Sequence, residues 1–367
     1  MLITLGILIY TGNGISKSTD KKFWRYGWLA IITFTLVEGT RFLRGADYPH
    51  YMMDLNGKLF TDYSEPGYLG FIYLFHDVLN LPFYWGFILY SFIYITPIIL
   101  IFKERKTIAK WGLPAVFLIT QMSFENIIRQ YIGISFILFA SYFFIKGDKK
   151  TSLLFLLCAP FFHLSALFPV VILLIMYKFN LDSIWNKSII LVCIYLAILL
   201  FWNVSYFSNV TSYIQMINLG NDVAMQGYID NADRWFSAEG LGDIHKGSII
   251  IEITKHAFNL MFIYYGSKLA NKSKAASIAF GGSYLSIIIF LLSGEIEIYQ
   301  RFAYWLAWLI PIYLGYMLSS KSYFRHKKII IIKFISLMYL ALCGSMYLIL
   351  VWKSPYAGCG FLWDYFK

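Results

Sequence analysis

The stretch SLLFLLCAPFFHLSALFPVVILLIMY, residues 152–177, contains no Asp, Glu, Lys or Arg. It is longer than the roughly 20 residues that a helix needs to cross a bilayer. The whole chain of 367 residues has the same character, because 59% of its residues are hydrophobic and only 14% are charged. A soluble globule cannot bury that much apolar surface. The sequence therefore predicts an all-α polytopic membrane protein that forms a single transmembrane domain over residues 1–367.

Further apolar segments are spread along the chain, and most approach the length of a membrane span. They are Met1–Tyr10, Trp24–Thr40, Phe83–Phe102, Trp111–Phe124, Ile127–Ile145, Ser188–Trp202, Gly247–Gly266, Ala275–Ser293, Phe302–Ser319 and Ile329–Trp352. The net charge of +11 comes from short basic clusters between these segments. Such clusters are topology signals, so we expect no nucleic-acid partner.

The basic loops also predict the orientation of the chain. They lie at alternate ends of the apolar segments, which makes that side cytoplasmic by the positive-inside rule. If residues 152–177 crossed the membrane once, the basic run Lys321–Lys333 would lie outside, against the rule. We therefore expect this stretch to enter and return, with a break at Pro160 and with His163 at the outward tip. Counting this hairpin as two passes gives about twelve crossings, with both termini outside.

Four arginines are expected on the outer side, at the ends of apolar segments: Arg41, Arg44, Arg129 and Arg301. Arg41 and Arg44 are three residues apart and are expected to share a helix face. Guanidinium groups that meet at one membrane depth usually hold an anion. The alternative is that each arginine reaches the lipid headgroups or pairs with a carboxylate, as Arg301 would with Glu297.

Two polar segments are expected to form a periplasmic cap over this region, residues 45–81 and residues 203–246. The first contains Tyr51, Glu65 and Tyr68, and tyrosine is common at membrane interfaces. The second is long enough to serve as a lid or as a solvated connector. In the span near residue 252, Glu252 is spaced to pair with Lys255 or His256.

Several short motifs in this chain resemble those of the EpsG family of Wzy-type polysaccharide polymerases. They are Arg41-x-x-Arg44-Gly45-x-Asp47-Tyr48-x-x-Tyr51, Glu65-Pro66-Gly67-Tyr68, Asn126-x-x-Arg129-Gln130, Phe162-His163-x-Ser165-Ala166, Tyr299-x-Arg301-Phe302 and Pro355-Tyr356. The motifs occur in the order of the family and cover nearly the whole chain.

The resemblance implies a GT-C-like, metal-independent glycosyltransferase without a cofactor. It would join oligosaccharide repeats carried on undecaprenyl diphosphate at the outer face of a bacterial inner membrane. The product would be O-antigen, capsule or exopolysaccharide, and a chain-length regulator is a candidate partner. The four arginines would bind the diphosphate, and Tyr51, Glu65, Tyr68, Asn126 and Gln130 would bind sugar.

Glycosyl transfer also needs a base for the acceptor hydroxyl, and two residues compete for that role. Asp47 lies three residues beyond Arg44, where neighbouring arginines would keep it ionised, but it could equally orient Arg44. His163 is the other candidate, because histidine is the side chain whose unperturbed pKa lies near neutrality, although a lone histidine in an apolar segment is often structural. Asp47 is the favoured candidate, and the choice stays open at this stage.

Two other classes of function remain as alternatives. A flippase for the same lipid would also have many spans and basic residues for the diphosphate, but the two halves of this chain show no repeat. A membrane acyltransferase would use His163 as its base. It would need an acyl donor on the cytoplasmic side, where the sequence has only basic loops. The pair Glu295 and Glu297 is the nearest approach to an acidic metal motif, and we expect neither a metal nor a nucleotide sugar.

Overall fold

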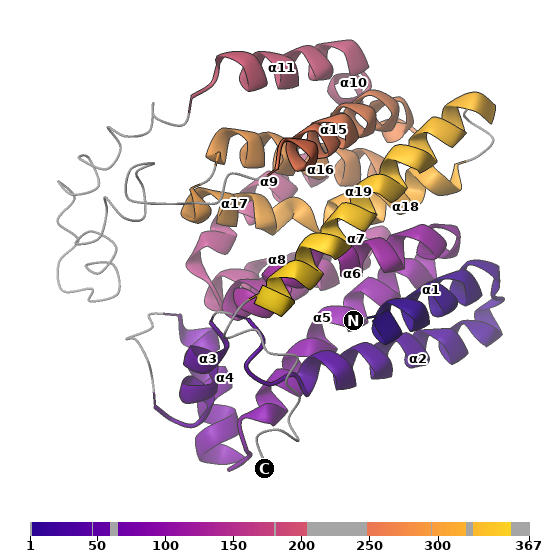
Figure 1. The fold of residues 1–367 in the computed structure, drawn as a ribbon. Coiled ribbons are helices and arrows are strands. Elements are labelled where there is room, and N and C mark those ends of the chain that lie inside the picture. The colour runs from indigo at the N-terminus through magenta and orange to yellow at the C-terminus, as the bar shows by residue number, and fades with distance from the viewer. Residues whose placement is uncertain are drawn as a thin grey trace. The chain divides into compact units, whose positions relative to one another are not determined.

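The computed structural model describes residues 2–45, 47–58, 65–179, 181–203, 248–294, 296–320 and 326–353. Every secondary-structure element in these ranges is a helix, which agrees with the predicted class. The chain divides into two compact units, and Figure 1 shows their helices. Apart from Asn203, the segment 203–246 lies outside the described residues, as do Pro355, Tyr356 and Glu295.

The first unit contains residues 1–60, 64–175 and 311–367. Its elements are α1 (Leu2–Lys17), α2 (Asp20–Gly39), α3 (Tyr48–Leu55), α4 (Pro66–Tyr73), the π-helix η1 (Leu74–Val78), α5 (Tyr84–Glu104), η2 (Lys106–Ile108), α6 (Ala109–Asn126), α7 (Ile128–Ile145), α8 (Lys149–Cys158), η3 (Ala159–Phe161), η4 (Leu164–Ala166), most of α9 (Leu167–Lys178), most of α18 (Leu309–Ser319) and α19 (His326–Lys353). Helix α2 packs on α1 and α5, α6 packs on α1 and α19, and α7 packs on α5 and α8 (Figure 1). Close helix contacts occur at glycines, as where Gly39 of α2 meets Ile88 of α5.

The second unit contains residues 61–63 and 176–310. Its described helices are α10 (Asp182–Trp185), α11 (Ser188–Phe201), α15 (Ile249–Ala270), α16 (Lys274–Ser293) and α17 (Glu297–Ala307). Helix α16 is central, since α10, α11, α15 and α17 all contact it. The Ser286 hydroxyl donates to the Ala303 carbonyl over 2.9 Å and so joins α16 to α17.

Four described helices are long and apolar enough to cross a membrane, namely α5, α7, α16 and residues 327–349 of α19. A fifth is reached if α17 and α18 form one span bent by 41°. This pair covers the apolar segment Phe302–Ser319 seen in the sequence, and the structure adds a break at Trp308. Pro311 has no N–H to donate to the carbonyl of Ala307, which accounts for a break at this point. The chain is a multi-pass membrane protein, and its twelve crossings stay a prediction.

The predicted break in residues 152–177 is present. Helix α8 ends at Cys158, two short 3-10 turns follow, and α9 begins at Leu167. Nδ1 of His163 accepts hydrogen bonds from the backbone N–H of Ser165, over 3.4 Å, and from its hydroxyl, over 3.1 Å. His163 therefore caps the second turn. Whether this stretch re-enters the membrane stays a prediction.

Gly67 lies where α4 meets the break in residues 152–177, and it offers a matched test of this packing. A Cβ on Gly67 would lie 2.7 Å from the carbonyl oxygen of Phe161, while a Cβ on Gly70 of the same helix would meet nothing within 4 Å. A backbone carbonyl cannot rotate away, so we expect Gly67→Ala to lower the free energy of unfolding by about 1–3 kcal/mol. Gly70→Ala is expected to be neutral or slightly stabilising. Thermal unfolding in detergent checks both variants, and equal midpoints would contradict this packing.

Candidate functional site

The segment that follows α2 carries Arg41 and Arg44, and it is not helical. Helix α2 ends at Gly39, so the prediction that the two arginines share a helix face is wrong. The chain turns because Leu43 has φ 49° and Gly45 has φ 102°, both in the left-handed region. Gly45 is also required sterically, since its Cβ would lie 2.5 Å from the carbonyl oxygen of Glu125. This turn directs the two guanidinium groups into the protein.

Arg44 lies in a buried carboxylate network, which we define as Arg44, Glu38, Glu125, Gln121 and Tyr347. Its guanidinium contacts the Glu38 carboxylate and lies 2.7 Å from Oε1 of Glu125, and all three side chains are buried. The Gln121 amide donates to both carboxylates, over 2.6 and 2.7 Å. The Tyr347 hydroxyl donates to Glu125 over 2.5 Å and so joins α19 to the network. These contacts satisfy charges that would otherwise be costly to bury.

Arg41 has no exposed surface and lies within an aromatic cage. One of its terminal nitrogens donates to the carbonyl oxygen of Glu38 over 2.6 Å. Its Nε and its other terminal nitrogen have no hydrogen-bond partner among the described residues, and the same is true of Nε of Arg44. The guanidinium carbon lies 5.2–5.9 Å from the ring centres of Tyr48, Phe87, Tyr90 and Phe124. Water or an anion usually satisfies buried donors of this kind.

Arg129, in the first turn of α7, is the more accessible arginine, with a side chain that is 21% exposed. It belongs to a group that we call the Arg129 cluster, formed by Arg129, Glu65, Tyr68, Tyr51 and Asp54. One guanidinium nitrogen lies 3.0 Å from the Glu65 carboxylate, and the guanidinium carbon lies 5.6 Å from the ring centre of Tyr68. Tyr51 forms a hydrogen bond with Arg129. The Tyr68 hydroxyl donates a hydrogen bond to the Asp54 carboxylate over 3.0 Å. Burial raises the pKa of the Tyr51 hydroxyl, although the Arg129 charge acts in the opposite direction. The phenol therefore stays neutral.

The remaining residues predicted for the site in the first unit have varied settings. Asp47 immediately precedes α3, is half-buried, and acts electrostatically on Tyr51. Asn126 ends α6, and its side-chain oxygen would lie 3.1 Å from a Cβ on Gly45. Gln130 is buried. Because Tyr51, Tyr68 and Gln130 are buried, their contact with sugar stays a prediction, as does that of Asn126 and Glu65.

Side chains of the α6–α7 junction, residues 125–130, contact residues from several other parts of the first unit. Glu125 pairs with Arg44, the Asn126 side chain lies against Gly45, and Arg129 pairs with Glu65. Motifs that are far apart in the sequence therefore meet at this junction. Within the described ranges, no three His, Cys, Asp or Glu side chains are grouped so that they could hold a metal ion.

Arg301 belongs to the second unit, where it lies half-buried in α17. Its convergence with the other arginines stays a prediction, and the Glu297 side chain lies outside the described residues. The expected pairing of Glu252 is confirmed, since its carboxylate lies 3.7 Å from both Lys255 and His256. His256 also bonds to Tyr195 of α11 over 2.6 Å.

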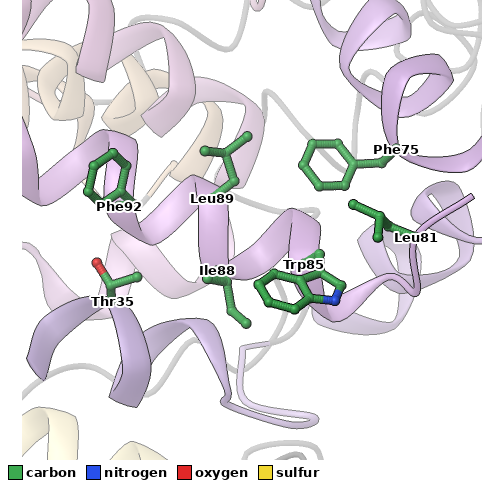
Figure 2. Close-up of a pocket in the computed structure, with 7 residues that line it drawn as sticks. All are labelled: Thr35, Phe75, Leu81, Trp85, Ile88, Leu89 and Phe92. Carbon is green, nitrogen blue, oxygen red and sulfur yellow. The ribbon is translucent and has the colours of Figure 1, made fainter. Parts of the chain in front are cut away.

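A separate pocket of about 310 Å³ lies between α2, η1 and α5 of the first unit. Figure 2 shows the side chains that line it, among them Phe75, Trp85 and Phe92. Thr35 contributes the only hydroxyl, and that hydroxyl has no hydrogen-bond partner among the described residues. Because this lining is almost wholly apolar, the pocket does not suit an anion.

Five residues of these two groups were not predicted as site residues, namely Glu38, Glu125, Gln121, Tyr347 and Asp54. A signal was present for two of them, because Glu38 is the only acidic residue of segment 24–40 and Glu125 immediately follows segment 111–124. Ionisable residues at membrane depth are rare and usually have a partner. The identity of that partner depends on tertiary contacts that the sequence does not display.

Comparison with known proteins places the chain in a family. The model of the EpsG family matches residues 24–359, which include every site residue described above. No curated protein and no solved structure matches the chain. Because the family match covers nearly the whole sequence, the chain belongs to the EpsG family, which is a Wzy-like polymerase family.

Proposed function

We propose that this protein is a polysaccharide polymerase that transfers a growing glycan from undecaprenyl diphosphate to a hydroxyl of another lipid-linked repeat unit. We further propose that it works without a metal at the outer face of a bacterial inner membrane. The observation that carries the proposal is that Arg44 and Arg129 lie at the α6–α7 junction of an EpsG-family chain, while Arg41 packs on the ring of Phe124 near the end of α6.

The reaction forms a bond between the acceptor oxygen and the anomeric carbon, while the bond from that carbon to the diphosphate oxygen breaks. The diphosphate leaves on its prenyl chain with an added negative charge, which cationic donors stabilise. Arg129 is the accessible donor, and its planar fork suits phosphate oxygens. The unpartnered donors of Arg41 and Arg44 are of the kind that an anion satisfies, and Arg301 completes the proposed set. The apolar pocket between α2 and α5 would suit the prenyl chain.

The acceptor proton passes to a base, for which Asp47 is the better candidate. Nδ1 of His163 already accepts from Ser165, a local role that explains its position. We therefore expect Asp47→Asn to reduce turnover by about 10²–10⁴-fold without loss of lipid binding. His163→Gln is expected to reduce turnover less and to lower stability. Single-turnover assays with purified variants check this, and the reverse order of effects would assign the base to His163.

Tyr51, Tyr68, Asn126 and Gln130 are proposed to form the sugar-facing wall beside Arg129. Tyrosine and amide side chains are suited to this role because they combine an apolar face with hydrogen-bonding groups. A chain-length regulator remains a proposed partner, and O-antigen, capsule or exopolysaccharide is the proposed product.

Reconstitution with purified lipid-linked repeat units tests the proposed function. The proposal expects a ladder of glycan lengths in liposomes without added metal or nucleotide sugar. Transbilayer movement without growth would indicate a flippase instead. Addition of acyl groups from a supplied acyl donor would indicate a membrane acyltransferase.

A further inference from the structure

Glu65 is placed unusually for a residue at the start of a helix. It immediately precedes α4, with extended backbone angles of φ −83° and ψ 108°, and its side chain makes no capping hydrogen bond to that helix. The carboxylate instead extends to Arg129 over 3.0 Å, and only 12% of the side chain is exposed. The side chain of Glu65 therefore pairs with a residue of α7 and does not cap its own helix.

Three of the groups that contact the Arg129 guanidinium differ in charge. Tyr68 presents a ring face, Tyr51 presents a neutral hydroxyl, and Glu65 alone among these three is anionic. Glu65 contacts the guanidinium through Nη1, so a phosphate group that binds the edge carrying Nη1 needs the position of the Glu65 carboxylate. The two anions would also repel each other at that distance. The ligand and Glu65 therefore compete for one cation.

A displaced Glu65 carboxylate has another favourable position nearby. The N-terminus of an α-helix presents backbone N–H groups and a partial positive charge, which stabilise an acidic side chain at that end. Helix α4 begins at Pro66 and continues into the π-helix that ends at Val78. Its start is held in place because Gly67 packs against the backbone of Phe161. Glu65 can therefore rotate to cap α4 while the helix itself remains in position.

We infer that Glu65 is a displaceable occupant of the anion site at Arg129. It neutralises Arg129 when no lipid is bound, and the donor diphosphate displaces it onto the N-terminus of α4. This inference rests on the proposed function, because it takes the incoming anion to be a prenyl diphosphate. It gives Glu65 a role in specificity, since a singly charged anion competes poorly with a carboxylate already held in place, whereas a diphosphate gains more from the same cation.

Binding of farnesyl diphosphate to the purified full-length protein, followed by calorimetry, tests this role. In Glu65→Gln the competing charge is removed, so we expect the dissociation constant to fall about ten-fold. Glu65→Asp has a shorter side chain that reaches Arg129 less well, so its affinity is also expected to increase, by a smaller factor. Arg129→Gln is expected to lose binding. Glu252→Gln, which removes a carboxylate of another ion pair in the second unit, is the matched control and is expected to bind as the wild type does.

The outcomes separate this inference from the proposed function. If the wild type binds farnesyl diphosphate while Glu65→Gln and Glu65→Asp bind equally well or more weakly, the displacement is overturned and the diphosphate site stands. Weaker binding by Glu65→Gln would show that Glu65 holds Arg129 in position for the anion. If the wild type and every variant fail to bind, the proposed function and this inference both fail. If Glu65→Gln does not fold, Glu65→Asp still tests the displacement.

Discussion

Replacing Glu125 by alanine is expected to lower the free energy of unfolding by about 3–5 kcal/mol, because it breaks a buried ion pair from one side. The Arg44 guanidinium would keep only the Glu38 carboxylate, and the Gln121 amide and the Tyr347 hydroxyl would each lose an acceptor. The same change removes the hydrogen bond that joins α19 to α6. Chemical or thermal unfolding of the purified protein in detergent measures the loss.

Two further variants make this result interpretable. Glu125→Gln keeps the hydrogen-bonding shape and loses only the charge, so an intermediate loss is expected. Glu104→Ala removes an exposed carboxylate at the end of α5 and is expected to change stability by no more than about 0.5 kcal/mol. If Glu125→Ala and Glu104→Ala unfolded at the same midpoint, the buried carboxylate network would not contribute to stability as described.

The second large effect is expected at Arg129. Arg129→Lys keeps the positive charge but loses the planar fork, and we expect polymerisation to fall about 10²–10³-fold, as when a preorganised donor is removed from a transition state. Stability should change little, because the Arg129 side chain is partly exposed. The rate at which polymer bands appear from lipid-linked repeat units measures the effect.

Arg25 supplies the matched control for this experiment. It is an exposed arginine near the start of α2, and Arg25→Lys is expected to polymerise at the wild-type rate. A fully active Arg129→Lys would show that Arg129 provides charge alone. A fully active Arg129→Gln would remove Arg129 from the proposed mechanism.

Much of the helical architecture is predictable from the sequence. Long apolar segments become helices because only a helix satisfies its own backbone within a bilayer, and the chain breaks near Pro160 because proline removes a donor. The position of Arg129 at the start of α7 also follows from the sequence, since a polar group interrupts two apolar segments there. These are local effects, and the local sequence contains the information.

The arrangement of the site depends on long-range contacts that the sequence does not show. Glu38 and Glu125 are far apart in the chain, and both meet Arg44 only because α2 and α6 lie in one unit. The apparent helix spacing of Arg41 and Arg44 is misleading, because the chain has already turned at Leu43 and Gly45. The sequence contains a local signal for the break at Trp308, because Pro311 lacks a backbone N–H. The segment around it is apolar throughout, and this character favours a single span.

A structure of the full-length protein with undecaprenyl diphosphate bound tests the central claim most directly. The account predicts that the phosphate oxygens lie within hydrogen-bonding distance of the Arg129 guanidinium, that Glu65 has left that guanidinium, and that Arg41, Arg44 and Arg301 face the same anion. A diphosphate bound elsewhere, with the ion pair between Arg129 and Glu65 intact, would contradict it.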